Sequence, residues 1–351
     1  MAASVDNLRM DASNSSALGD FSSTQMGNCK FKYWNISRPS FSDLASCIPV
    51  CDDLGKIGNA SLCSSASCLM EGDRPVGWGG AGEDVWDKIR EEARADVEQE
   101  PLLGAYYFST VLSHNSLESA LAAHLASKLS SDHLPVHVLL EVFLSVFSGD
   151  QEVKRAIRED LKGAKERDPA CVSFVHCLLN FKGFLACQAH RVAYKLWTSG
   201  RRVMALLIQN RVTEVFAVDI HPAAKIGSGI LFDHATGVVI GETAVIGDNV
   251  SILHNVTLGG TGKVSGDRHP KIGNGVLIGA GTQVLGNVRV GDGAKIGAGS
   301  VVLKEVPART TAVGNPARLV GGKTNPIKLE SIPSFSMDHT SFINDWSDYV
   351  I

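Results

Sequence analysis

The sequence lacks a long apolar run and an excess of either charge. None of its hydrophobic stretches approaches the roughly 20 residues that a membrane-spanning helix needs. The 33 Lys and Arg residues are balanced by 37 Asp and Glu residues, which gives a formal net charge of −4. Because nucleic acids and anionic membranes attract basic chains, we expect neither of them to be the main partner.

A CxxC pair is also missing, although the chain has eight cysteines. Cys47 and Cys51 come closest to a metal-binding pair, but no second pair or histidine cluster lies near them in the sequence. We therefore expect no structural zinc site. The spacing fits reduced thiols better than a disulfide framework, which is typical of cytoplasmic proteins.

The N-terminal segment lacks the features of a targeting sequence. It is rich in serine, but its first 20 residues carry Asp6, Asp11 and Asp20 against the single Arg9. Transit peptides are rich in arginine and poor in acidic residues, and a secretory signal needs an apolar core. We expect residues 1–82 to be a disordered extension and the protein to be cytoplasmic.

Residues 83–215 show the spacing of amphipathic helices. In residues 83–101 apolar side chains recur every four positions, and the pattern stops before Pro101. A further amphipathic stretch begins at Asp150, and we expect its helix to end near Gly163. This part of the chain is predicted to be an all-helical domain.

Residues 216–323 repeat with a period of six. The aliphatic or aromatic positions are Ile220, Ile226, Phe232 and Val238, then Ile240, Ile246, Ile252 and Leu258, then Ile272, Ile278, Val284, Val290, Ile296 and Val302. This period fits neither an amphipathic helix nor a hairpin sheet. It is typical of a parallel β-helix, in which each hexad forms one short strand and one corner. We therefore predict an α+β fold, with the helical domain first.

The repeat is interrupted twice. From Phe232 to Ile240 the step is eight residues, in the segment FDHATG, and from Leu258 to Ile272 it is fourteen. Insertions in repeat folds usually map to one functional face, and the longer insertion is expected to leave the coil as a loop.

The first interruption places a carboxylate near an imidazole. If three hexads close one coil, Asp219 and His234 are neighbours across one corner, because stacked strands lie about 4.8 Å apart. A carboxylate can fix the tautomer of an imidazole and stabilise its protonated form. The pair therefore predicts a general base.

Several segments resemble the serine O-acetyltransferases, hexapeptide-repeat enzymes that make O-acetylserine for cysteine synthesis. They include ILFDHATG, SILHNVTLGGTGK, GDRHPKIG and VGNPARLV, and the resemblance covers about residues 83–323. It implies a left-handed β-helix and direct transfer of an acetyl group from acetyl-CoA, as co-substrate, to L-serine. It also implies a trimer that pairs into a dimer of trimers, and neither a bound cofactor nor a metal.

The matching motifs imply roles for individual residues. His234 matches the general base and Asp219 its orienting carboxylate. The residues that match the binding sites are Asp168, Asp233, Arg268 and His269 for serine, and Gly260, Thr261, Ala280 and Ala298 for acetyl-CoA.

The final segment, residues 324–351, is polar and shows no periodicity. Its last ten residues nevertheless include Phe342, Trp346, Tyr349 and Ile351. It resembles the tail of plant family members, whose C-terminal isoleucine docks into O-acetylserine sulfhydrylase. The resemblance implies a flexible tail that binds this enzyme.

Three alternatives stay open beside this interpretation of the sequence. The chain could be a non-catalytic scaffold for the sulfhydrylase. It could be a zinc hydro-lyase of the carbonic anhydrase type, with ligands among His221, His234, His254 and His269. Asp168, which precedes Pro169, also has the pattern of a helix N-cap.

Overall fold

The computed structural model describes residues 84–262 and 265–340. The predictions for residues 1–82, for the Cys47 and Cys51 pair and for Ile351 lie outside these residues. Within them, no helix is both long and apolar enough to cross a membrane.

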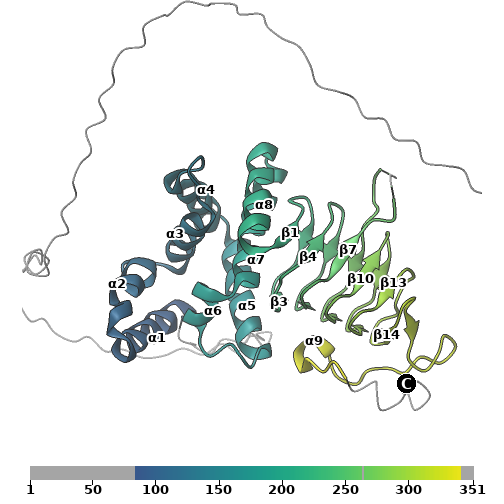
Figure 1. Cartoon of the computed structure of the whole chain (residues 1–351). Coiled ribbons are helices and arrows are strands. Elements are labelled where there is room, and N and C mark those ends of the chain that lie inside the picture. Colours follow the sequence, from purple (N-terminus) through teal and green to yellow (C-terminus); the bar gives the residue numbers. More distant parts are fainter. Residues whose placement is uncertain (1–83, 263–264, 341–351) are drawn as a thin grey trace, which may run out of the picture. The chain divides into compact units, whose positions relative to one another are not determined.

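Helices form the first part of the described chain (Figure 1). They are α1 (Val85–Gln99), α2 (Gly104–Tyr107), α3 (Leu117–Leu129), α4 (Val136–Gly149), α5 (Gln151–Arg167), α6 (Phe174–Asn180), α7 (Lys182–Thr198) and α8 (Arg202–Phe216), with a 3-10 turn η1 (Pro101–Leu103) and a π-helical turn η2 (Phe108–Leu112). Side chains of Asp84, Ser116, Asp150 and Ser173 accept backbone N–H groups at the starts of α1, α3, α5 and α6. Each cap supplies a partner for a donor that the helix itself leaves free.

Short strands then wind into a parallel β-solenoid of about five turns. They are β1 (Val218–Ile220), β2 (Lys225–Ile226), β3 (Leu231–Phe232), β4 (Val238–Ile240), β5 (Val245–Ile246), β6 (Ser251–Ile252), β7 (Thr257–Gly259), β8 (Lys271–Ile272), β9 (Leu277–Ile278), β10 (Gln283–Leu285), β11 (Arg289–Val290), β12 (Lys295–Ile296), β13 (Val301–Val302), β14 (Thr311–Val313) and β15 (Arg318–Leu319). The predicted α+β fold is confirmed, and the solenoid is consistent with a left-handed β-helix of hexapeptide repeats.

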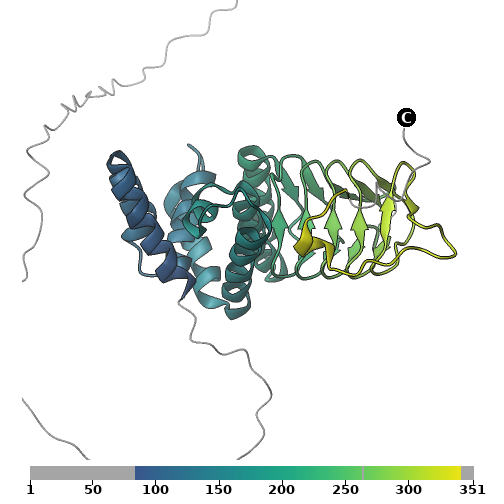
Figure 2. The same ribbon diagram turned by 90° about the horizontal axis from the view of Figure 1, so that it is seen from below.

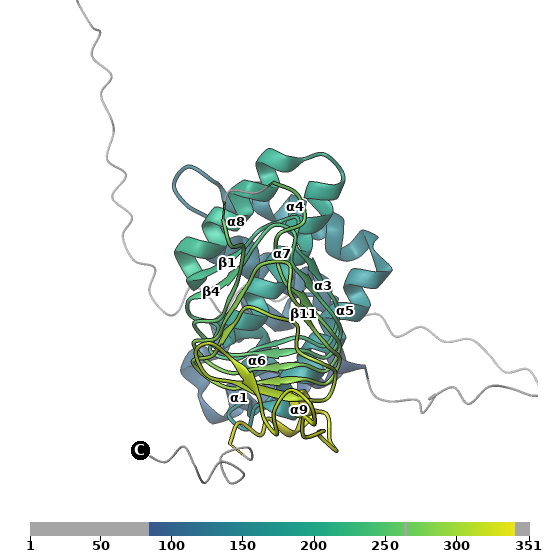
Figure 3. The ribbon, with the colours of Figure 1, turned by 90° about the vertical axis from the view of Figure 1, so that its right-hand side faces the viewer.

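Three sheets enclose the core of the solenoid. The first sheet has the order β1-β4-β7-β10-β13, the second β2-β5-β8-β11, and the third β3-β6-β9-β12-β14-β15. Seen end-on, the coils superpose, with the first and second sheets on opposite sides (Figure 3). Inward-pointing residues of the first sheet, such as Ile220, Ile240 and Leu258, pair in register and are at most 3% exposed. The aliphatic residues that recur every six positions in the sequence therefore form a buried row inside the solenoid.

Hydrogen bonds between equivalent positions of successive coils measure the length of each coil. Asn274 N donates to Asp292 Oδ1 across a regular coil, an interval of 18 in the sequence. Ser228 N donates to Asp248 Oδ1 across the coil that contains FDHATG, an interval of 20. Thr243 N donates to His269 Nδ1 at an interval of 26, across the insertion between β7 and β8. The two interruptions therefore add two and eight residues where the sequence predicted them.

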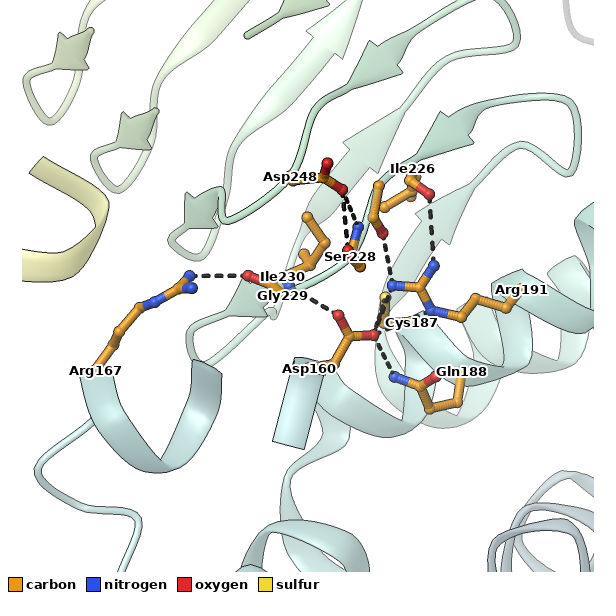
Figure 4. Close-up of polar contacts among 11 residues, drawn as sticks. Asp160, Arg167, Cys187, Gln188, Arg191, Ile226, Ser228, Gly229, Ile230 and Asp248 are labelled. Carbon is orange, nitrogen blue, oxygen red and sulfur yellow. Dashed lines mark hydrogen bonds and ion pairs between the residues drawn. The ribbon is translucent and has the colours of Figure 1, made fainter. Parts of the chain in front are cut away.

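Buried polar groups join the helices to the first coil through hydrogen bonds and an ion pair (Figure 4). Asp160 of α5 is fully buried, and its Oδ1 accepts the backbone N–H of Ile230 at 2.8 Å. Its Oδ2 accepts from Arg191 Nη2 at 2.6 Å and from Gln188 Nε2 at 2.8 Å. Arg191 also donates to the carbonyl of Gly227 at 2.7 Å. The first coil therefore supplies partners for charges that would be costly to bury alone.

Two helical glycines lie against the first coil, and Gly183 makes the closer approach. A Cβ atom on Gly183 of α7 would lie 2.1 Å from the carbonyl oxygen of Phe232, and one on Gly163 of α5 would lie 3.4 Å from that of Gly229. The prediction that a helix ends near Gly163 is wrong, because α5 continues to Arg167. Gly163 is a contact point for the first coil and not a helix end.

The third sheet is covered on its outer side. Its outward-pointing row consists of Leu231, Ser251, Leu277, Lys295 and Thr311, all of which are at most 3% exposed. Residues 329–338, here called the C-terminal strap, include the short helix α9 (Pro333–Ser336) and lie along the stack of coils (Figure 2). Leu329 N donates to Arg309 O at 2.8 Å, and Lys295 Nζ to Asp338 O at 3.1 Å. The first part of the expected flexible tail thus packs against the coils.

Candidate functional site

The first interruption of the repeat has an unusual backbone. His234 and Ala235 are consecutive non-glycine residues with positive φ angles, 55° and 56°. Such conformations cost about 1–2 kcal/mol per residue and are often found at functional sites. At this corner the side chain of His234 is 75% exposed, whereas Ala235 is fully buried. The strained corner presents an imidazole to the outside of the coil.

Acidic and imidazole side chains gather at this corner, which we call the His234 edge. Asp233 Oδ1 lies 3.8 Å from His234 Nε2. The ring of His254, one coil further on, stands edge-to-face with that of His234, with ring centroids 5.8 Å apart. Burial raises the pKa of Asp233, the imidazole of His234 lowers it, and the negative charge of Asp168 raises it further. Asp233 and His234 therefore lie within ion-pair distance, and Asp168 is near enough for its charge to act on Asp233.

Asp168 reaches this edge from the end of α5. It is the C-cap of that helix, and its Oδ1 accepts the backbone N–H of Ala170 at 2.8 Å. The next helix, α6, starts at Phe174 and is capped by Ser173. The alternative that Asp168 is a helix N-cap is therefore wrong, because Pro169 begins a turn and not a helix.

Asp219 lies on β1, and its carboxylate has another partner. Gln209 Nε2 of α8 donates to Asp219 Oδ1 at 2.6 Å. In the described part of the chain Asp219 and His234 form neither a hydrogen bond nor an ion pair, and Asp233 is the carboxylate within ion-pair distance of His234. The pairing of Asp219 with His234 stays a prediction.

The Arg-His pair after the long insertion lies at another corner, which we call the Arg268 edge. Arg268 Nη2 forms an ion pair with Glu242 Oε2 at 2.7 Å. His269 Nδ1 lies 3.1 Å from the backbone N of Thr243. Burial, together with the positive charge of Arg268, lowers the pKa of His269. His269 is therefore neutral near pH 7, with Nδ1 as acceptor and the proton on Nε2.

The residues predicted to contact acetyl-CoA divide between the same two edges. Ala280 and Ala298 lie on the next two coils after His254, on the same edge. Gly281 N donates to His254 O, and Gly299 N donates to Ala280 O. Gly260, by contrast, borders Arg268 and His269: a Cβ there would lie 3.5 Å from Arg268 O and 3.6 Å from His269 Nε2. Thr261 follows Gly260 on the Arg268 edge.

The first sheet separates the two edges. Its longer strands have three residues, a span of about 10 Å at ~3.3 Å per residue. The His234 edge lies where these strands begin, and the Arg268 edge lies where they end. One chain therefore carries two partial groups of the predicted site residues on opposite margins of one sheet.

The structure also bears on the zinc alternative. Within residues 84–262 and 265–340, no group of three or more His, Cys, Asp or Glu side chains is arranged to hold a metal ion. His234 and His254 lie on one edge, whereas His269 lies on the other, and the His221 ring packs against Trp197.

Comparison with known proteins agrees with this geometry. The family model for the serine acetyltransferase N-terminal region matches residues 85–189, and the model for the bacterial transferase hexapeptide (six repeats) matches residues 269–304. Serine acetyltransferase 1, chloroplastic, of Arabidopsis thaliana is 67% identical over 269 residues, which cover 77% of this chain and 86% of the relative. The chain belongs to the serine acetyltransferase family. Serine acetyltransferase 3, mitochondrial, of the same plant is 65% identical over 269 residues, covering 77% of this chain and 69% of the relative.

Solved structures of family members share the fold. Soybean serine acetyltransferase complexed with serine has 66% sequence identity and a TM-score of 0.66, covering 67% of this chain and 97% of that chain. Serine acetyltransferase in complex with coenzyme A from Brucella abortus strain S19 has 47% identity and a TM-score of 0.67, covering 70% and 98% of the two chains.

Sequence reasoning missed the residues that hold the predicted site residues in place. Glu242 and Thr243 bind Arg268 and His269, and Gln209 binds Asp219. Thr243 and His269 occupy equivalent positions on either side of the enlarged coil. Counting the ejected loop as part of one coil would have placed them together, whereas no pattern in the sequence indicates Gln209.

Proposed function

We propose that this serine acetyltransferase transfers the acetyl group of acetyl-CoA to the hydroxyl of L-serine, which yields O-acetyl-L-serine and CoA. The reaction is the first committed step of cysteine synthesis. The observation that carries the proposal is the strained corner, which places the His234 imidazole beside Asp233 and Asp168 in a member of this family. Acetyl-CoA is a co-substrate and not a resident cofactor.

The chemistry needs a base, because a serine hydroxyl is a poor nucleophile. His234 takes the hydroxyl proton as the oxygen attacks the thioester carbonyl. The tetrahedral intermediate then breaks its C–S bond, and His234 returns the proton to the CoA thiolate. The acetyl group passes directly to serine without an acyl-enzyme. Asp219 orients the imidazole in the assembled site.

The two edges suit the two charged groups of serine. Asp168 and Asp233 face the ammonium, and a bound ammonium favours the ionised form of Asp233 against the burial that raises its pKa. Arg268 offers a planar fork for the carboxylate, and His269 offers its Nε2–H. Ala280, Ala298, Gly260 and Thr261 contact acetyl-CoA through their backbones.

A complete site forms between two copies of the chain. The His234 edge and the Arg268 edge border the same sheet, so a three-fold arrangement around the first sheet brings one edge of each copy against the other edge of the next. The expected assembly is a trimer, with two trimers paired through the helical domains. In this proposal residues 83–215 form the helical domain and residues 216–323 the acyltransferase domain.

The C-terminal tail is proposed to bind O-acetylserine sulfhydrylase through Ile351. Aromatic and aliphatic residues close to the terminus support this, since apolar anchors suit a docking peptide. Deletion of Ile351 is expected to weaken the complex, measured by titration with the purified sulfhydrylase. The acidic N-terminal segment supports a cytoplasmic location, although relatives are named chloroplastic and mitochondrial.

Thiol release from acetyl-CoA, followed with and without L-serine, tests the function. His234→Ala is expected to lower serine-dependent turnover by about 10²-fold or more, because a positioned acid–base group is lost. His137→Ala, an exposed histidine on α4, is the matched control and should keep wild-type turnover. Absence of serine-dependent release from folded wild type would favour the scaffold alternative. Full activity of His234→Ala would remove the residue from the mechanism.

A further inference from the structure

Arg167 connects the helices to the coils directly beside Asp168. It is the last residue of α5 and only 4% exposed. Its Nη1 donates to Gly229 O at 2.9 Å and to Ser251 Oγ at 3.3 Å, and its Nη2 donates to Asn249 Oδ1 at 3.2 Å. Figure 4 shows the guanidinium reaching from α5 to Gly229. These partners belong to the first two coils, so Arg167 holds the end of α5 in place.

The hydrogen bonds of Asp168 stay within the end of α5 and the turn that follows it. Among the described residues, the hydrogen-bond partner of its carboxylate is the backbone N–H of Ala170, two residues along the same turn. Its backbone N–H donates to Ala164 O within α5, and its carbonyl oxygen accepts the backbone N–H of Cys171 at 2.9 Å. Because these partners are local, the position of Asp168 relative to Asp233 depends on how the end of α5 is anchored to the coils, and Arg167 is the last anchored residue of that helix.

The C-terminal strap contacts Arg167 on the side of the guanidinium that faces Phe335. The ring of Phe335 lies over the guanidinium, with its centroid 4.9 Å from Cζ. Ser251, which accepts a hydrogen bond from Arg167, donates through Oγ to Ser334 O at 3.2 Å. Arg167 is thus joined to the strap by a cation–π contact and by one bridging hydroxyl.

We propose that Arg167 and Phe335 are positioning residues for serine: the strap holds the guanidinium, and through it Asp168, at the His234 edge. This rests on the proposed function, because it takes Asp168 to bind the serine ammonium. Loss of the Phe335 ring exposes one face of the guanidinium to water and loosens the end of α5. Serine binding weakens as a result, whereas acetyl-CoA, held along Ala280 and Ala298, is bound as before.

Steady-state kinetics of the full chain test the proposal with Phe335→Ala. The matched control is Ile332→Ala, which also truncates an apolar strap residue but one that packs over Gly275. The two side chains are similarly exposed, 47% and 44%. Phe335→Ala is expected to raise the KM for serine about three- to tenfold, the size of one cation–π contact. Its kcat and its KM for acetyl-CoA should change by less than about twofold.

Two further variants separate positioning from general damage. Phe335→Tyr keeps the ring and should restore the wild-type KM for serine. Arg167→Lys keeps the charge but loses the planar fork, and it should raise that KM more than Phe335→Ala does. An unchanged KM for serine in Phe335→Ala, or an equal rise in Ile332→Ala, would overturn the proposal.

A binding measurement distinguishes this failure from failure of the proposed function. L-serine should raise the unfolding midpoint of the wild type, and Phe335→Ala should need about three- to tenfold more serine for the same rise. Protection of both proteins at equal serine concentrations would refute the positioning role alone. A wild type that neither binds nor acetylates serine would refute the proposed function itself.

Discussion

At the scale of single residues, the fully buried carboxylate of Asp160 is the charged group whose loss should destabilise the molecule most clearly. It pairs with Arg191, which is 8% exposed, and it caps the backbone N–H of Ile230. A buried ion pair is not by itself strongly stabilising, but removal of one partner leaves the other charge without compensation. Asp160 therefore matters more for stability than any surface ion pair of the same helix.

Asp160→Asn is expected to lower the free energy of unfolding by about 3–5 kcal/mol, because the Arg191 guanidinium keeps its burial and loses its counter-charge. Urea unfolding at fixed protein concentration measures the change. The neighbouring substitution Glu159→Gln is the control, since the two side chains of its ion pair with Lys162 are 44% and 47% exposed. That pair should contribute less than about 1 kcal/mol. Equal losses in both variants would contradict this account.

At the scale of elements, backbone contact between α7 and the first coil decides how the helices meet the solenoid. The contact exists because Gly183 brings the helix onto the carbonyl oxygen of Phe232, a strand residue that precedes Asp233 and His234. A side chain at position 183 would separate α7 from β3. The position of the His234 edge relative to the helices is therefore set by a residue without a side chain.

Gly183→Ala should destabilise the chain by about 3 kcal/mol, the upper range for overpacking, because a backbone oxygen 2.1 Å from the new Cβ has to move. This outweighs the roughly 1 kcal/mol by which alanine is favoured over glycine inside a helix. Gly149→Ala in α4 meets no atom within 4 Å and is the matched control, expected to be neutral or slightly stabilising. Thermal unfolding of both variants decides the sign, and a stabilised Gly183→Ala would refute the close contact.

At the scale of the whole molecule, the division of the predicted site residues between two edges leads us to propose that activity depends on assembly of the chain. A chain that lacks one edge can still offer the other edge to its neighbour. This leads to a test that does not depend on imaging the assembly, because inactive chains can complement one another only where a site is shared between copies.

His234→Ala and Arg268→Ala should each be nearly inactive alone and should regain activity when co-assembled in equal amounts. In a random equal mixture, about a quarter of the sites combine the intact His234 edge of an Arg268→Ala chain with the intact Arg268 edge of a His234→Ala chain. About a quarter of wild-type turnover is therefore expected. Mixing without dissociation and reassembly is the control and should restore nothing. If each site were contained within one chain, co-assembly would leave the activity at the level of the single variants.

The fold and much of the candidate site could be predicted because they rest on local patterns. The six-residue period indicates a buried row of aliphatic side chains inside the coils. The two interruptions of this period mark the corners that hold His234 and the loop before Arg268. The motifs FDHATG and GDRHPKIG carry the family resemblance in contiguous residues. Helix limits were less predictable, since Gly163 has the appearance of a helix end and is a packing contact.

The fold class, the positions of the two breaks and the residue types of the candidate site can be inferred from the order of the amino acids, because each depends on neighbours within a few positions. The groups that hold these residues are visible only in the folded chain: Gln209 binds Asp219, Glu242 binds Arg268, and the strap contacts Arg167. Each of these contacts joins different elements of the fold, and the strap reaches Arg167 from beyond the last strand of the solenoid. Packing brings such partners together by their distance in space, and the order of residues along the chain does not indicate that distance.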